Sequence, residues 1–270
     1  DMLFVHKSLF PIDIIILILL AKKIFKKKII FDLDDAEWKH SPTKSRILAT
    51  WADVVFAGSH LIYGWGKRYN AAVELVPTCF DHTVYKKYSI IPEKRETYTL
   101  VWVGLGTSHF RFGNLDILQP IFTALKERSF RFRFLLIGSQ NNRDLKQFFT
   151  SKNYESIFID NLHWTEEGIV AKMLNMHKAD IGLAPSKDSS FEQGKCAGKI
   201  LEYMACGIPV VASPMGENNI VVRDGINGFL ADSVVRWVEK ILSLAENIEL
   251  RRRLGRAGQS SVADFYSYQV

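Results

Sequence analysis

The chain has 270 residues, of which 47% are hydrophobic and 24% are charged. This composition excludes disordered, collagen-like and low-complexity proteins, and the length predicts one large domain or two smaller ones. The formal net charge of +6 at pH 7 favours an anionic ligand or an anionic membrane surface, but it is too small to indicate nucleic-acid binding. The three cysteines support neither a disulfide framework nor a zinc site, and they indicate a reducing, cytoplasmic location.

Short apolar runs alternate with helix-length amphipathic runs, which is typical of an α/β protein with parallel sheets. In the first part we expect four strands, at Leu3–His6, Ile29–Asp32, Val54–Ala57 and Val73–Pro77. Helices are expected between them at Pro11–Lys27, Pro42–Trp51 and His60–Tyr69. The apolar stretch Leu9–Ala21 is shorter than the ~20 residues that span a bilayer, so we do not predict a transmembrane helix there.

The stretch Asp81–Thr97 is polar and rich in Lys and Tyr, which predicts a linker and places the domains at residues 1–97 and 98–270. The second domain predicts six strands, at Thr99–Gly104, Phe132–Gly138, Ile157–Ile159, Ile181–Ala184, Pro209–Ala212 and Gly228–Leu230. Its helices are expected at Leu115–Glu127, Arg143–Thr150, Glu166–Met173, Gly198–Cys206, Ser233–Ala245 and Ile248–Gly258. Two such halves predict a ligand crevice between them, at the carboxyl ends of their strands.

The stretch Ser190–Ser213 is the richest candidate site. A polar loop leads into the helix that begins near Gly198, whose free N–H groups and positive dipole end favour a phosphate. Lys195 and Lys199 add two positive charges there, and Glu202 lies one turn further along, where a carboxylate can accept the hydroxyl groups of a ribose. On the residues alone, a surface Lys199–Glu202 pair worth ~0.3–0.5 kcal/mol remains the alternative.

The run 202–213, EYMACGIPVVAS, is followed by Met215-Gly216 and by DGINGFL at 224–230. With ADIGLAP at 179–185, VWVG at 101–104, ADVVFAGS at 52–59 and VPTCFD at 76–81, it resembles the retaining family 4 glycosyltransferases, also called group 1. The resemblance implies the GT-B fold, two Rossmann-like lobes with parallel sheets. It also implies transfer from a nucleotide-diphosphate sugar, with retention and without metal or cofactor, to a saccharide or lipid-linked acceptor.

Members of this family usually carry two glutamates separated by seven residues, the second of which matches Glu202. Gly194 occupies the first position, so Glu192 is the candidate for the missing acidic contact to the donor sugar. The usual Arg and Lys that hold the diphosphate also lack clean equivalents. We therefore expect Lys195 and Lys199 to do this work, together with a loop over Gly104–Ser108 that contains Gly106 and Thr107. The resemblance places Gly216 at the donor as well.

The segment Ile29–Asp35, IIFDLDD, supports competing interpretations. The resemblance aligns Asp34 with a histidine that lies beside the donor sugar in many family members. Alternatively, Asp32 and Asp34 belong to a magnesium-dependent phosphohydrolase similar to the haloacid dehalogenases, to the metal-binding D-x-D of the other glycosyltransferase fold, or to helix caps. A non-catalytic nucleotide-sugar-binding module is a further alternative. The seven histidines show no triad or metal-ligand spacing, so we expect each to be structural or solvated.

Five lysines follow the first predicted helix: Lys22, Lys23, Lys26, Lys27 and Lys28. Contact with anionic lipid headgroups at the inner face of a membrane and a solvated helix end both explain them. The first lobe, with four strands against six, is expected to be incomplete at its start. An uncovered edge strand would then favour self-association, and nucleotide binding would occur with little or no transfer.

Overall fold

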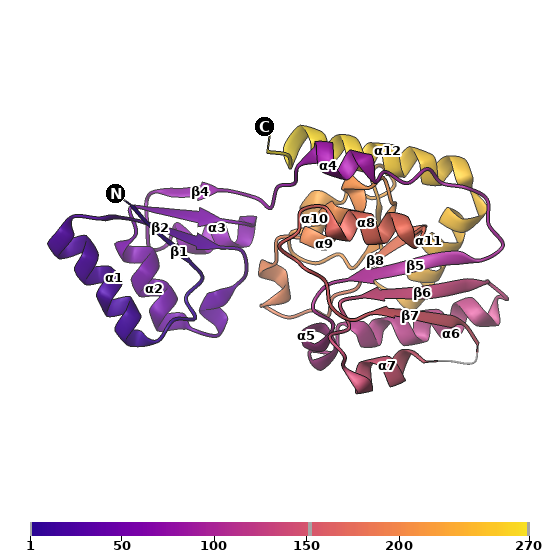
Figure 1. Ribbon diagram of the computed structural model, residues 1–270, viewed down its shortest axis with the longest axis horizontal. Helices are drawn as coiled ribbons and strands as arrows, with labels where there is room; N and C mark the ends of the chain where they lie inside the picture. The colour runs from indigo at the N-terminus through magenta and orange to yellow at the C-terminus, as the bar shows by residue number, and fades with distance from the viewer. Residues whose placement is uncertain (1, 151–152, 269–270) are drawn as a thin grey trace. The chain divides into compact units, whose positions relative to one another are not determined.

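A computed structural model describes residues 2–150 and 153–268. The chain divides into two compact units, which we call unit 1 and unit 2 (Figure 1). Unit 1 comprises Asp1–Thr78, Asp188–Ala197 and Met215–Glu217, and unit 2 comprises Cys79–Lys187, Gly198–Pro214 and Asn218–Val270. Both units are α/β with a parallel sheet, which confirms the predicted fold class.

Unit 1 is built on a four-stranded sheet in the order β1-β2-β3-β4. The strands are β1 (Met2–His6), β2 (Lys28–Leu33), β3 (Val54–Ala57) and β4 (Val73–Leu75). The helices are α1 (Ile12–Phe25), η1 (Glu37–Lys39), α2 (Pro42–Trp51), α3 (His60–Gly66) and the short η3 (Glu192–Gly194). Each predicted strand and helix of this part is present, with ends that move by up to three residues.

The core of unit 1 follows from the alternation of its strands. In β2, Ile29, Phe31 and Leu33 are fully buried, whereas the residues between them are partly exposed. Val55 and Ala57 of β3 continue this buried face. The register pairs His6 with Asp32, so the polar residues that end β1 and β2 lie side by side at the carboxyl edge of the sheet.

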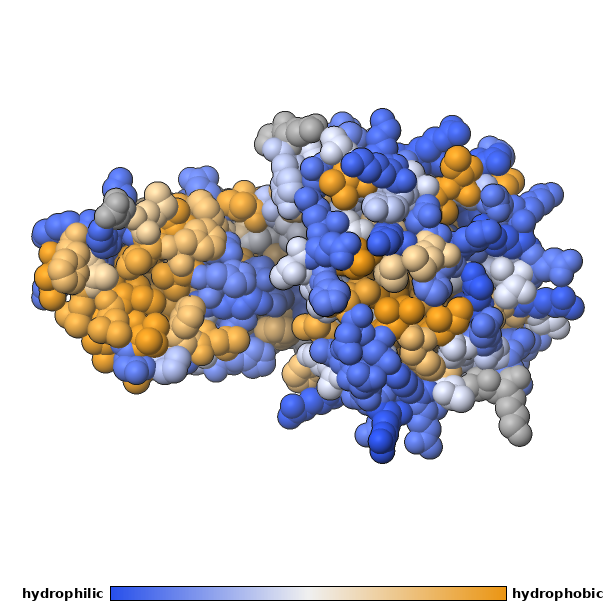
Figure 2. Space-filling view, viewed as in Figure 1, coloured by the Kyte–Doolittle hydropathy of each residue, from blue (hydrophilic) through white to orange (hydrophobic). Residues whose placement is uncertain are grey.

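The outer surface of unit 1 is unusually apolar. Ile12, Leu17 and Phe25 of α1 are 56%, 59% and 69% exposed, and Phe4 of β1 is 60% exposed. Figure 2 shows this hydrophobic surface over the part of the molecule that contains α1 and β1. Among the described residues, no helix is both long enough and apolar enough to cross a membrane.

Unit 2 is built on a six-stranded sheet in the order β10-β9-β8-β5-β6-β7. The strands are β5 (Tyr98–Val103), β6 (Phe132–Ile137), β7 (Glu155–Ile159), β8 (Ile181–Ala184), β9 (Val210–Ala212) and β10 (Phe229–Leu230). Because alternate residues point to opposite faces, Trp102, Phe134 and Leu183 join one aromatic-rich core, on which α6 (Leu118–Glu127) and α11 (Val234–Glu246) pack. The sequence predicted all six strands.

The remaining elements of unit 2 follow the sheet. They are α4 (His82–Lys87), α5 (Gly106–Arg111), η2 (Leu115–Ile117), α7 (Arg143–Phe149), α8 (Ile169–Met176), α9 (Gly198–Ala205), α10 (Asn218–Val221) and α12 (Ile248–Phe265). Helices α4, α5 and α10 lie where the sequence analysis predicted none, and α12 runs seven residues beyond its predicted end at Gly258. Helix α4 lies inside the predicted linker, where the Asp81 carboxylate accepts the N–H groups of Thr83 and Val84 and caps it. Helix α5 replaces most of the predicted Gly104–Ser108 loop.

The sheet of unit 2 reverses its strand order between β5 and β8. The two strands pair only at Leu100↔Ile181 and Val101↔Gly182, so they separate toward their carboxyl ends. Tyr203 of α9 lies at this separation. Its buried hydroxyl accepts the N–H of Val103 at 3.0 Å and lies 3.4 Å from the carbonyl oxygens of both Val101 and Leu183. A point where the strand order reverses is where open α/β sheets bind ligands.

We predict that Tyr203→Phe destabilises unit 2 by ~1–3 kcal/mol, because the N–H of Val103 would lose its partner in the core. Urea unfolding followed by circular dichroism measures the change. Tyr154→Phe is the matched control, because the Tyr154 hydroxyl has no hydrogen-bond partner among the described residues. Removing that hydroxyl should leave stability equal or higher, and an equal loss in both variants would contradict the bridging role of Tyr203.

Candidate functional site

The carboxyl end of β5 and the start of α9 come together in unit 2. Gly104 follows β5 with φ of +147°, and a Cβ at that position would lie 3.0 Å from the Trp102 ring and 3.7 Å from Cε of Lys199. The Lys199 ammonium lies 5.1 Å from the centroid of the same ring. A glycine is therefore required here, and it leaves the first turn of α9 and its lysine beside the point where the strand order reverses.

A cavity of about 500 Å³ contains Glu202. Four aromatic residues line it: Phe80, Tyr85, Trp164 and Tyr268. Trp164 is 44% exposed and Tyr268 is 67% exposed, so both rings are open to a ligand. The volume is in the range of small-ligand sites, and flat aromatic walls suit a nucleobase. Nothing in the spacing of these aromatic residues marked them in the sequence, because they come from three separate segments.

Glu202 is held on the wall of this cavity by Tyr85, whose hydroxyl donates to its Oε1 at 3.4 Å. Burial raises the pKa of Glu202 to about 7, although the nearby Lys199 acts in the opposite direction. The pKa of the Tyr85 hydroxyl is also raised, mainly by its own burial and then by the charge of Glu202. Glu202 is thus a carboxylate at a cavity wall that contacts Tyr85 of α4, and its contact with a ribose stays a prediction.

Gly106 and Thr107 take part in local structure. The Gly106 N–H donates to the carbonyl oxygen of Gly138 at 2.8 Å, and a Cβ on Gly106 would meet that oxygen at 2.7 Å. The Thr107 N–H donates to Oε1 of Gln140 at 3.1 Å. Both residues lie in the first turn of the short helix α5, so the loop conformation that the sequence predicted at these two positions is wrong.

Other predicted donor residues lie in unit 1. Glu192 is 6% exposed, and its Oε1 lies 2.5 Å from the Lys195 ammonium, whereas its Oε2 has no hydrogen-bond partner among the described residues. Gly194 explains the departure from the family pattern. A Cβ there would lie 2.6 Å from Cβ of Ala36, so a glutamate does not fit. Gly216 is equally tight, because a Cβ would meet the carbonyl oxygen of Gln193 at 2.2 Å.

Asp34 belongs to a charged cluster at the carboxyl ends of β1 and β2. Lys7 Nζ lies 3.0 Å from Asp34 Oδ1 and 3.3 Å from Asp35 Oδ2. His6 Nδ1 lies 2.7 Å from Asp32 Oδ2, and its Nε2 lies 3.8 Å from Asp34. Burial acts to lower the pKa of Lys7, but the two carboxylates outweigh it and the pKa is raised.

The sequence analysis missed His6 and Lys7. The signal was available, because His6 ends and Lys7 follows the strand that precedes IIFDLDD, and neighbouring parallel strands end at the same edge of a sheet. The Lys7 ammonium pairs with Asp34 and Asp35, and the His6 ring contacts Asp32, so these contacts occupy the carboxylates that a magnesium-dependent phosphohydrolase would need as ligands and nucleophile. The phosphohydrolase interpretation is therefore not favoured.

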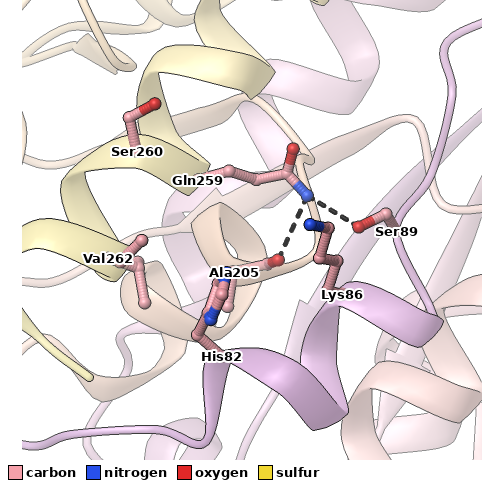
Figure 3. A pocket seen from close by; sticks show the side chains of 8 residues that line it. His82, Lys86, Ser89, Ala205, Gln259, Ser260 and Val262 are labelled. Carbon is pink, nitrogen blue, oxygen red and sulfur yellow. Dashed lines mark hydrogen bonds between the residues drawn. The ribbon is translucent and has the colours of Figure 1, made fainter. Parts of the chain in front are cut away.

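A second cavity in unit 2, of about 210 Å³, lies among α4, the end of α9 and α12 (Figure 3). Gln259 crosses it, and its Nε2 donates to Ser89 Oγ at 2.7 Å and to the carbonyl oxygen of Ala205 at 3.4 Å. These bonds tie α12 to the segment after α4, so the polar groups of this cavity serve the packing of the unit.

The sequence between residues 97 and 247 matches the model of the family described as "Glycosyl transferases group 1". This match covers more than half of the chain. The chain belongs to the group 1 glycosyltransferases.

Among the curated proteins, a D-inositol 3-phosphate glycosyltransferase of Segniliparus rotundus is 30% identical over 154 residues, which are 56% of this chain and 33% of that protein. An uncharacterized glycosyltransferase of Methanocaldococcus jannaschii is 40% identical over 86 residues, 31% of this chain and 23% of that protein. The chain therefore spans a third or less of the curated relatives that it matches.

Two solved structures share the fold over 98% of this chain. Sucrose-phosphate synthase from Thermosynechococcus elongatus superposes with a TM-score of 0.70 at 13% identity and is covered to 69%. Anabaena HepE, in complex with UDP and glucose, superposes with a TM-score of 0.69 at 16% identity and is covered to 74%. The two parallel-sheet, Rossmann-like lobes of this group 1 glycosyltransferase thus have the GT-B fold, as the sequence predicted.

We predict that nucleoside binding strengthens as the pH rises through about 7, because only the ionised form of Glu202 accepts two ribose hydroxyls. With the pKa of Glu202 at about 7, affinity at pH 6 should be about tenfold weaker than at pH 8. Calorimetric titration with uridine, adenosine and guanosine measures this without the titration of a phosphate. Glu202→Gln should bind weakly at both pH values, and a pH dependence that persists in this variant would contradict the assignment.

Proposed function

We propose that this protein transfers a sugar from a nucleotide-diphosphate donor to a saccharide or a lipid-linked glycan. The observation that carries the proposal is the cavity of about 500 Å³ around Glu202 in unit 2. It combines aromatic walls and a carboxylate at a sheet whose strand order reverses beside the start of α9. Membership of the group 1 glycosyltransferases supports the same class of reaction.

The cavity supplies the two contacts that a nucleoside needs. Trp164 and Tyr268 offer partly exposed rings on which a base can stack, and Glu202 accepts the ribose hydroxyls. Acidic residues also predominate on its rim, where Asp81, Glu166 and Glu167 lie. An uncharged nucleoside tolerates this rim, whereas a diphosphate has to extend away from it, toward the positive end of α9.

Lys199 and the first-turn N–H groups of α9 are the proposed diphosphate contacts in unit 2. As the bond between the sugar and the diphosphate breaks, negative charge grows on the leaving phosphate, and donors fixed in place stabilise it. We assign no protein nucleophile, metal ion or organic cofactor, and we propose retention at the anomeric carbon from the resemblance to family 4. Asp34, Glu192, Lys195 and Gly216 keep their expected roles toward the sugar and its phosphates as predictions.

Two relatives give the donor and acceptor classes to test first. HepE is described in complex with UDP-glucose, and the relative from Segniliparus rotundus is named for D-inositol 3-phosphate. We therefore put UDP-glucose first among donors and a phosphorylated polyol first among acceptors. Nucleotide binding without transfer or donor hydrolysis would instead identify a non-catalytic binding module.

Titration with UDP, GDP, ADP and dTDP tests the proposal, and failure of all four to bind at about millimolar concentration would reject it. We predict that Lys199→Met lowers the affinity for the diphosphate at least about tenfold, because a charge-assisted contact contributes ~1.5–3 kcal/mol. The affinity for the matching nucleoside should stay unchanged. Lys195→Met tests the second predicted phosphate contact and should have a smaller effect, because its ammonium also pairs with Glu192. Equal weakening of nucleoside and diphosphate would indicate a folding defect.

We also propose that α1 of unit 1 binds the surface of an anionic membrane at the cytoplasmic face. Only Ile15 of this helix is buried, and Ile12, Ile16 and Leu17 are at least half exposed. Lys23, Lys26 and Lys28 are exposed beside this apolar surface, which is the combination that lies in a bilayer interface. Lys22 differs from the expectation, because its ammonium contacts Asp53 at 2.9 Å and the Trp51 carbonyl oxygen at 2.7 Å.

Co-sedimentation with vesicles of phosphatidylglycerol and phosphatidylcholine tests this contact. Replacing Lys23, Lys26 and Lys28 by Gln should reduce binding at low salt by ~1 kcal/mol per lysine. The matched control replaces Lys94, Lys172 and Lys178, three exposed lysines of unit 2, and should bind as the parent does. Equal loss in both triple variants, or no binding by the parent chain, would refute the proposal.

A further inference from the structure

Unit 1 contains a cavity of about 320 Å³ that none of the predicted site residues lines. It lies among η1, α3 and the segment 190–193, and its walls include Trp38, Lys39, Trp65, Arg68 and Gln193. All of these residues belong to one compact unit, so the cavity is formed by unit 1 alone. Its volume is that of a site for a small ligand.

One wall of this cavity is a pair of stacked indoles. The rings of Trp38 and Trp65 lie 4.6 Å apart at an interplanar angle of 6°. Trp65 is 8% exposed and also packs against Tyr69 at 5.1 Å, so it is fixed in the core. Trp38 is partly exposed and is held flat by this support. A rigid, flat indole offers the apolar C–H face of a sugar ring a large contact at little cost in side-chain entropy.

The charged residues of the cavity wall are basic. Lys39 and Arg68 are exposed, and in the described part of the chain no carboxylate forms an ion pair with either of them. His60 also lines the cavity, and its Nδ1 lies 3.0 Å from Oε1 of the buried Glu217. The wall itself contains no Asp or Glu. An arginine and a lysine without carboxylate partners attract a carboxylate or a phosphate, and the planar guanidinium can hold either with two hydrogen bonds.

The cavities of the two units therefore differ in charge. The Glu202 cavity of unit 2 carries four acidic residues, which suit the hydroxyls of an uncharged nucleoside. The Trp38 cavity of unit 1 combines an aromatic wall with cations and has no lining carboxylate to accept ribose hydroxyls. This difference favours an anionic saccharide over a second nucleotide in unit 1.

We propose that the Trp38 cavity binds a saccharide ring that carries a carboxylate or a phosphate group, and that this ring is part of the acceptor. The acceptor assignment rests on the proposed glycosyl transfer, but the binding itself does not. The ring stacks on Trp38, and its anionic group contacts Arg68 and Lys39. The proposal thus narrows the acceptor class from saccharides in general to acidic ones.

Ligand-observed NMR titration of the purified chain with glucuronic acid, glucose 6-phosphate and glucose tests the proposal. The two acidic sugars should bind about fivefold more tightly than glucose at low salt, which is the scale of an exposed ionic contact. The stronger of the two identifies the anionic group. Equal binding of all three sugars, no binding of the acidic sugars, or displacement of a bound acidic sugar by UMP would overturn the proposal.

Variants separate the two parts of the contact. Arg68→Met should reduce the affinity for the acidic sugars toward that for glucose, whereas replacing Arg46, an exposed arginine of α2 outside the cavity, by Met should change nothing. Trp38→Ala should abolish binding of all three sugars, and Trp51→Ala is its control. If Trp38→Ala fails to fold by circular dichroism, the arginine pair decides.

A parallel titration with UDP, GDP, ADP and dTDP reports on the proposed donor site. Nucleotide binding without acidic-sugar binding would reject this inference and leave the proposed function intact. Acidic-sugar binding without nucleotide binding would reject the proposed function and leave the site.

Discussion

The separation of β5 from β8 is the constraint on which unit 2 depends. Parallel strands that separate inside a sheet leave backbone N–H and C=O groups without partners in a buried region, which costs free energy. The Tyr203 hydroxyl reaches into this gap from α9, accepts the N–H of Val103 and lies within reach of two carbonyl oxygens. Gly182 makes room for the ring, because a Cβ there would lie 2.4 Å from it. The gap between β5 and β8, the Tyr203 ring and Gly182 therefore depend on one another.

The anchoring of Tyr203 between β5 and β8 also positions the candidate donor site. Tyr203 is a buried residue of α9, so its anchoring positions the helix that carries Lys199 and Glu202. Helix α9 then presents its first turn beside Gly104 and its Glu202 carboxylate to the aromatic cavity. Within the EYMACG run, Tyr203 anchors the helix and Glu202 faces the cavity. The two are neighbours on one helical turn, so a change in the position of one would move the other.

Glycines and charge pairs shape the surface of unit 1. Gly194 and Gly216 allow the segments 188–197 and 215–217 to pack closely within this unit, and the Ser59 hydroxyl donates to the carbonyl oxygen of Gly194 at 3.0 Å. Glu217 accepts the N–H of His60 at 3.0 Å and thereby satisfies the start of α3. The acidic residues at the ends of β1 and β2 are matched by His6 and Lys7, whereas Lys39 and Arg68 have no carboxylate partner in the described residues. The charges of Lys39 and Arg68 are therefore available to a ligand at the Trp38 cavity, whereas the charge of Lys7 at the strand ends is paired with carboxylates.

The sequence by itself determined the elements whose signals are local. Periodicity gave the two series of strands, and the runs EYMACGIPVVAS and DGINGFL indicated the family and the position of Glu202. The prediction from sequence failed at α4. The polar composition of this stretch indicated a linker, but the Asp81 cap stabilises a short helix there. The prediction also failed at α5, where Gly106 begins a helix rather than a loop because its N–H bonds to Gly138 of another segment.

Only the tertiary structure decided which distant residues share a site. Tyr85, Trp164 and Tyr268 share a cavity with Glu202 although they lie 117, 38 and 66 residues from it in the sequence. Trp38 likewise shares a cavity with Trp65 and Arg68, which lie 27 and 30 residues further along the chain. The structure also showed that Lys195 pairs with Glu192, a contact that the sequence left open because these residues were predicted to lie in a loop. The physical reason is that spacing along a chain fixes neighbours only within a helix or a strand. Contacts between elements depend on how their buried faces pack, and burial in turn sets the charge state of a residue such as Glu202.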